Sequence, residues 1–266
     1  MNELQRFEIQ GADGKAIRGD RLSGKDRKIL FITGFLSKRW GNKSKALAQW
    51  CAEKGWGFCC YDVRGFGDSE GSFTDYTLSD WIADARTVLT SLGDGHPLTR
   101  PPQARQNAPP ARVTIVGNSL GSWVAWLVAR EFPIVEELIL IAPAFNMMGE
   151  RAKTIPPERL HAWHTAGWMP WDDDPLHKDW PLSWKWVEES EAYWAKTFDA
   201  LRPVRTTIMH GLQDRVISPE GSRRFADELL RRVPDYALHL RLIPGDHRLS
   251  GPEHVETLRR LVVERR

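Results

Sequence analysis

The sequence predicts an α/β protein with one mostly parallel, eight-stranded sheet and helices on both faces. Short apolar runs alternate with helical patterns along the 266 residues, and this alternation is typical of a parallel sheet covered by helices. The length suits one such domain with an insertion. A single aromatic segment, residues 143–203, interrupts the alternation and predicts that insertion.

Each expected strand is a short apolar run bounded by turn residues. The runs are 6–10, 16–22, 28–33, 57–62, 112–116, 136–141, 206–210 and 237–243. The first two flank Gly11-Ala12-Asp13-Gly14 and predict an opening hairpin. Helical patterns separate the later runs at 44–54, 77–92, 121–131, 220–233 and 252–264. Thr77 is an expected N-cap, and the Gly- and Pro-containing stretch 93–110 is an expected surface loop.

The interrupting segment holds seven of the 13 tryptophans. A segment this aromatic is not expected to be disordered, and we interpret 143–203 as a helical cap on a core of 1–142 and 204–266. It would lie over the carboxyl edge of the sheet, where open α/β sheets bind ligands. Some tryptophans are expected to line an apolar acyl or aryl pocket. The alternative for each is that it only packs the cap.

Composition excludes several classes of partner. The formal charge of +2 implies no nucleic acid. An odd count of three cysteines favours a reducing compartment, and no signal peptide is visible, so we expect a cytoplasmic protein. No apolar run approaches the ~20 residues of a membrane span. No spacing of His, Cys, Asp or Glu suggests a metal, no cofactor is expected, and the oligomeric state stays open.

Gly117-Asn118-Ser119-Leu120-Gly121 carries the main chemical signal. It lies between an apolar run and a helical pattern, which is typical of the strained turn that exposes a nucleophilic serine. Side chains at 117 and 121 are expected to collide with the neighbouring strand and helix. The alternative is a plain turn rich in small residues.

Asp214 and His247 are the expected acid and base. Each follows a predicted strand, so both should reach the same sheet edge as Ser119. A serine nucleophile needs a histidine base, and the base needs an orienting carboxylate. Asp214 could instead cap a turn, and His247 could be a surface residue. Asp246 is a weaker acid candidate because adjacent side chains diverge, and His210 is expected to bond to the backbone.

Two backbone N–H groups should stabilise a tetrahedral oxyanion. Leu120 directly follows the nucleophile, and Phe35 lies in the loop after strand 28–33. The alternative for this loop is that Gly34 only permits a tight turn. The Gly-rich stretch 62–71 is expected to shape the edge, because no Gly-Lys-Ser/Thr follows it.

These stretches resemble the α/β-hydrolase superfamily over residues 5 to 262. The stretch 62–69 is similar to the family's loop after its fourth strand, and 117–121, 210–214 and 246–247 are similar to its elbow, acid and base regions. More narrowly, the chain resembles the abhydrolase subgroup of palmitoyl-protein thioesterases and acyl-glucuronide esterases in the stretches 34–37, 45–47, 117–123 and 246–248. The resemblance implies Ser119 as nucleophile, Asp214 as acid and His247 as base. The 93–110 stretch and the tryptophan-rich cap depart from the family.

The expected function is cofactor-free hydrolysis of a carboxylic ester or thioester, with a small-molecule substrate. Hydrolysis of a C–C bond, a lactone or an amide on the same triad is the second reading. A serine at 119 disfavours chemistry that needs a carboxylate nucleophile. The third reading is a binding protein that keeps the fold without activity.

Overall fold

The computed structural model describes residues 3–25, 27–92 and 112–264. Its strands form one eight-stranded sheet in the order β1-β2-β4-β3-β5-β6-β7-β8. They are β1 (Leu4–Gln10), β2 (Ala16–Leu22), β3 (Arg27–Ile32), β4 (Gly57–Tyr61), β5 (Arg112–Asn118), β6 (Val135–Ile141), β7 (Arg205–Gly211) and β8 (Leu238–Ile243). β2 pairs antiparallel with β1 and β4, and all other pairs are parallel. The predicted fold class is therefore confirmed.

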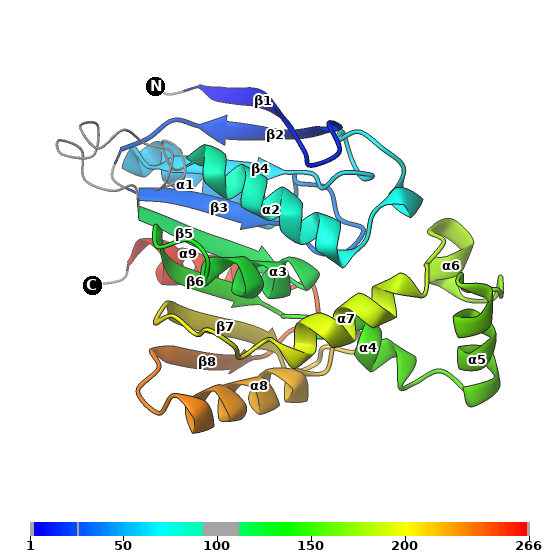
Figure 1. Cartoon of the computed structure of the whole chain (residues 1–266). Coiled ribbons are helices and arrows are strands. Elements are labelled where there is room, and N and C mark those ends of the chain that lie inside the picture. The colour runs from blue at the N-terminus through cyan, green and yellow to red at the C-terminus, as the bar shows by residue number, and fades with distance from the viewer. Residues whose placement is uncertain (1–2, 26, 93–111, 265–266) are drawn as a thin grey trace.

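Helices cover both faces of the sheet (Figure 1). The core helices are α1 (Asn42–Lys54), α2 (Leu78–Leu92), α3 (Leu120–Ala129), α8 (Pro219–Arg232) and α9 (Pro252–Val263), with a short 3-10 helix at Phe73–Asp75. α2, α3 and α8 lie in front of the sheet in this view, and α1 and α9 lie behind it. Because residues alternate along a strand, each strand feeds two apolar layers. Cys59 belongs to the front layer and Cys60 to the back layer, as their adjacency predicts.

The structure adjusts several predicted boundaries by one to three residues. α1 begins at Asn42, β5 extends to Asn118, and α3 begins directly after Ser119. Thr77 precedes α2, and its carbonyl accepts the Trp81 N–H at 3.1 Å. The predicted loop at 93–110 lies outside the described residues.

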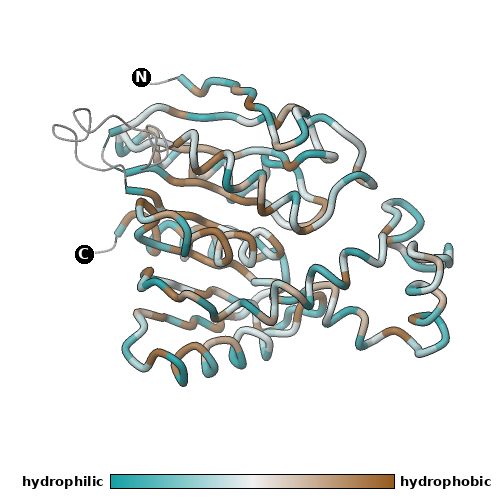
Figure 2. Tube along the Cα trace, in the orientation of Figure 1, coloured by the Kyte–Doolittle hydropathy of each residue, from teal (hydrophilic) through white to brown (hydrophobic). Residues whose placement is uncertain are grey.

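Four further helices lie between β6 and β7. They are α4 (Met147–Ala152), α5 (Pro157–Ala166), α6 (Pro175–Asp179) and α7 (Lys185–Ala195). Figure 1 shows them beyond the carboxyl ends of the parallel strands, and Figure 2 shows that they are far less hydrophobic than the central strands and α3. α7 is tied to the core through Glu189, whose carboxylate accepts the Ser79 N–H at 2.8 Å and the Thr77 hydroxyl at 3.0 Å.

Candidate active site

Ser119 lies in the sharp turn between β5 and α3. Its φ of 54° and ψ of −121° are strained for a residue with a side chain. A Cβ at Gly117 would lie 2.5 Å from the Cα of Ser122 at the start of α3. A Cβ at Gly121 would lie 2.2 Å from the Thr33 carbonyl oxygen, just beyond β3. The predicted collisions with strand and helix are confirmed.

Ser119, His247 and Asp214 meet at the carboxyl edge of the sheet. The Ser119 hydroxyl lies 3.1 Å from Nε2 of His247, and Nδ1 of His247 lies 2.7 Å from Oδ2 of Asp214. An ionised carboxylate only accepts hydrogen bonds, so the His247 proton belongs on Nδ1 and leaves Nε2 free to accept from the serine. The structure thus joins the three predicted residues in one hydrogen-bonded chain.

Asp214 is held ionised by four donors. Its Oδ1 accepts the N–H groups of Val216 and Ile217, both at 2.8 Å, and its Oδ2 accepts from His247 and from His210. Burial alone would raise the pKa of Asp214, but the hydrogen bonds from His210, His247 and the two amides outweigh it and hold that pKa well below its usual range. The carboxylate is therefore suited to stabilise a histidinium.

His210 is a further contact of the site, and its sequence context did not indicate this role. It does bond to the backbone as expected, with Nε2 3.1 Å from the Ile217 carbonyl oxygen. The same nitrogen lies 3.0 Å from Oδ2 of Asp214, and Nδ1 lies 2.7 Å from the Ser222 hydroxyl. The four-residue spacing of His210 and Asp214 was the available signal.

Two other carboxylates that follow strands stabilise the loops in which they lie. Asp246 accepts the N–H groups of Arg248 and Leu249 at 3.0 and 3.1 Å, so it caps the turn beside His247. Asp62 is buried and forms an ion pair with Arg39, whose N–H also donates to it at 2.6 Å. This arrangement agrees with a shaping role for the stretch 62–71.

The two expected oxyanion donors are the backbone N–H groups of Phe35 and Leu120. Within the described residues, the N–H groups of Phe35 and Leu120 have no acceptor in the protein. Leu120 is the first residue of α3, where N–H groups point out of the helix. The Phe35 ring packs edge-on against Trp186 of α7, with ring centroids 5.3 Å apart. The Phe35 loop therefore rests on the segment between β6 and β7.

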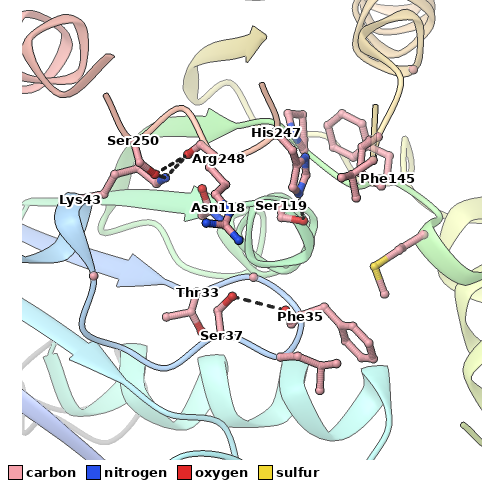
Figure 3. Close-up of a pocket in the computed structure, with 18 of the residues that line it drawn as sticks. Thr33, Phe35, Ser37, Lys43, Asn118, Ser119, Phe145, His247, Arg248 and Ser250 are labelled. Atoms are coloured by element: carbon pink, nitrogen blue, oxygen red, sulfur yellow. Dashed lines mark hydrogen bonds between the residues drawn. The ribbon is translucent and has the colours of Figure 1, made fainter. Parts of the chain in front are cut away.

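A cavity of about 880 Å³ opens at Ser119 and His247. Part of its wall is apolar, formed by Phe35, Leu36, Phe145, Met147, Met148, Leu176, Val216 and Ile217. Another part is polar: Figure 3 shows Lys43, Arg248 and Ser250 on one side of Ser119 and Phe145 on the other. The cavity is large enough for a small-molecule ligand, and both a hydrocarbon chain and a polar group would find matching surface.

The prediction that cap tryptophans line this cavity is wrong, because none borders it in the described part of the chain. Trp163 packs edge-on against Trp171 and Trp184 and donates to the Leu182 carbonyl at 3.0 Å. Trp186 packs against Phe35, Phe73 and Trp81, Trp180 against Phe66 and Phe73, and Trp194 against Phe198, while Trp168 is 41% exposed. The short helices need large side chains to form a core, and the tryptophans supply them.

Lys43 is a second residue at the site that the sequence patterns did not indicate. Its side chain comes from the first turn of α1 and is buried, and its ammonium donates to the carbonyl oxygen of Arg248, next to His247. Burial lowers the pKa of Lys43 to about 8, although Asp246 opposes the shift.

The described residues contain no cluster of three or more potential metal ligands. None of their helices is long and apolar enough to cross a membrane.

This chain is similar to several known proteins. The mouse mitochondrial palmitoyl-protein thioesterase ABHD10 is 27% identical over 243 residues, which cover 90% of this chain and 74% of the relative. The solved structure of mouse alpha/beta hydrolase domain-containing protein 10 has a TM-score of 0.78 at 24% identity and covers 98% of this chain and 97% of that one. A solved Agrobacterium vitis protein has a TM-score of 0.77 at 21% identity, covering 98% of both chains. The model of the alpha/beta hydrolase family matches residues 29–261, and this chain belongs to that family.

Proposed function

We propose that this protein is a serine hydrolase that cleaves carboxylic esters or thioesters through an acyl-enzyme. The observation that carries the proposal is the hydrogen-bonded chain of Ser119, His247 and Asp214, whose first two members border a partly apolar cavity. The relative named palmitoyl-protein thioesterase supports an acyl substrate.

The first step is attack by Ser119 on the acyl carbonyl carbon. Nε2 of His247 takes the hydroxyl proton as Oγ bonds to carbon, and Asp214 stabilises the resulting imidazolium. The histidine then gives this proton to the departing alcohol or thiol. A water molecule then attacks the acyl-enzyme as the same histidine takes its proton. The bond between the acyl carbon and Oγ of Ser119 breaks, the histidine returns the proton to Oγ, and the acid leaves.

The amides of Phe35 and Leu120 receive the negative oxygen of each tetrahedral intermediate. Both N–H groups lack another acceptor in the described residues, so they are available without reorganisation. The T-shaped contact of the Phe35 ring with Trp186 supports the loop that carries one of them.

The segment 143–203 acts as a cap on a core formed by 1–142 and 204–266. It contributes Phe145, Met147 and Met148 to the apolar wall, which suits an acyl or aryl group. Methionine side chains adapt to ligands of different shape, so this wall should accept a range of chain lengths. The leaving group would face the polar wall at Lys43 and Arg248.

The substrate is a small-molecule ester or acyl thioester, and we propose a cytoplasmic location. The three cysteines, all buried and free, agree with a reducing compartment. The curated relatives are named mitochondrial, so fractionation of cells that express the native gene is the test of location.

Two measurements test the function. Wild-type protein is incubated with p-nitrophenyl esters and acyl thioesters from acetyl to palmitoyl, and a fluorophosphonate probe is used to label the activated serine. We expect hydrolysis, labelling in wild type and no labelling in Ser119→Ala. Absence of both turnover and labelling would support a binding protein instead.

A further inference from the structure

His210 is buried beneath the active site at the end of β7. Its side chain has no exposed surface and contacts both β7–α8 loop atoms and α8 itself. Nε2 lies 3.0 Å from Oδ2 of Asp214 and 3.1 Å from the Ile217 carbonyl oxygen, while Nδ1 lies 2.7 Å from the Ser222 hydroxyl. A buried imidazole with three partners holds a single orientation.

The partners also determine the tautomer. Nε2 faces a carboxylate and a carbonyl oxygen, which only accept, so it must carry a proton. Ser222 can donate its hydroxyl proton to an unprotonated Nδ1. With the proton on Nε2, the neutral ring shares one N–H between Asp214 and the Ile217 carbonyl, accepts from Ser222 and buries no second charge.

This proton is directed at the same carboxylate oxygen that His247 uses. Oδ2 of Asp214 receives Nδ1–H of His247 at 2.7 Å and Nε2–H of His210 at 3.0 Å, and the backbone holds Oδ1. The carboxylate can neither rotate nor take up a proton without losing a buried hydrogen bond.

We propose that His210 is a positioning residue for the acid of the triad. It orients Oδ2 of Asp214 toward His247 by donating a second hydrogen bond to that oxygen. The hydrogen-bonded chain then runs from Ser119 through His247 and Asp214 to His210 and ends at Ser222. This inference rests on the proposed serine hydrolase function.

A pair of amide variants tests the proposal. His210→Gln places an N–H near the position of Nε2, whereas the shorter His210→Asn reaches Ser222 but not Asp214. We expect His210→Asn to lower kcat roughly tenfold with little change in KM, because one charge-assisted hydrogen bond is lost. The acid limb of its pH–rate profile should also move to higher pH, since Asp214 becomes more basic. His210→Gln should restore both toward wild type.

Leu229→Ala is the matched control for stability. Leu229 is buried in α8 and does not border the cavity, so this variant should be less stable and yet keep the pH profile of wild type. Equal effects of the Asn and Gln variants, or a shifted profile in Leu229→Ala, would overturn the positioning role and indicate packing alone.

Wild-type protein provides a test that needs neither turnover nor a variant. In protein labelled with ¹⁵N-histidine, NMR should show the ring proton of His210 on Nε2 and none on Nδ1. An Nδ1–H tautomer would contradict the proposal. A protein that hydrolyses no ester but shows this tautomer would refute the proposed function and leave the hydrogen-bonded chain intact.

Discussion

The carboxyl edge of the sheet and the segment between β6 and β7 both border the cavity, but they are built differently. At the sheet edge, parallel strands place Ser119, Asp214 and His247 at ends that must lie near one another. Between β6 and β7, four helices of 5 to 11 residues pack through tryptophans that do not reach the cavity. The first region carries the proposed catalytic groups, and the second shapes one wall and supports Phe35.

The largest expected effect is at the sheet edge. Ser119→Ala should lower kcat by ~10⁴-fold or more, because no group remains to form the acyl-enzyme. Stability should change little, since only one hydroxyl is removed. Initial rates with a p-nitrophenyl ester and a thermal melt measure the two quantities. A variant with activity within tenfold of wild type would remove Ser119 from the mechanism.

Two neighbouring loops allow a matched comparison of carboxylates. Asp214→Asn should lower kcat by ~10³-fold or more, because an amide no longer stabilises the imidazolium and can favour the wrong His247 tautomer. Asp246→Asn should cost far less, since Asp246 only caps a turn. Steady-state kinetics on both variants decides the assignment, and the reverse ranking would transfer the acid to Asp246.

These two regions also differ in what sequence alone predicts. The strand ends were predictable because apolar runs mark parallel strands, and the carboxyl ends of parallel strands share an edge. The contact of Lys43 with the His247 loop joins residues 205 apart in the chain, which no local pattern reports. The contact of His210 with Asp214 could not be predicted with the same certainty, because it depends on how the loop between β7 and α8 turns back. The roles of the tryptophans depend on packing between short, irregular helices, for which periodicity gives no guide.

One variant of a residue in the apolar cavity wall and one of a packing tryptophan can test whether the two groups differ in function. Met147→Ala removes part of the apolar wall, so the ratio of kcat/KM for hexanoyl over acetyl esters should fall roughly threefold or more. Trp163 does not border the cavity. Trp163→Phe removes its indole donor to the Leu182 carbonyl and should lower the free energy of unfolding by about 1–3 kcal/mol, with that ratio unchanged. Ester kinetics and denaturant unfolding measure the two outcomes. A changed ratio in Trp163→Phe would mean that the tryptophan core also controls selectivity.

The smallest expected effect concerns Lys43, which links α1 to the loop of His247. Burial lowers its pKa to about 8, against ~10.4 in an unfolded chain, so between these values the folded chain binds fewer protons. Its contribution to stability therefore rises with pH in this window, since the unfolded chain binds more protons there. Its hydrogen bond to the Arg248 carbonyl should weaken at the same time, because a charged donor bonds more strongly than a neutral one.

Activity and stability should consequently move in opposite directions above pH 8. We expect kcat to fall roughly threefold between pH 7.5 and 9.5 as the His247 loop loosens, and Lys43→Met to show a lower kcat without this alkaline limb. Lys45→Met, on an exposed position of the same helix, should keep the limb. pH–rate profiles and unfolding free energies for the three proteins measure both trends. If kcat of Lys43→Met still falls at alkaline pH as in wild type, the contact of Lys43 with the His247 loop does not control activity.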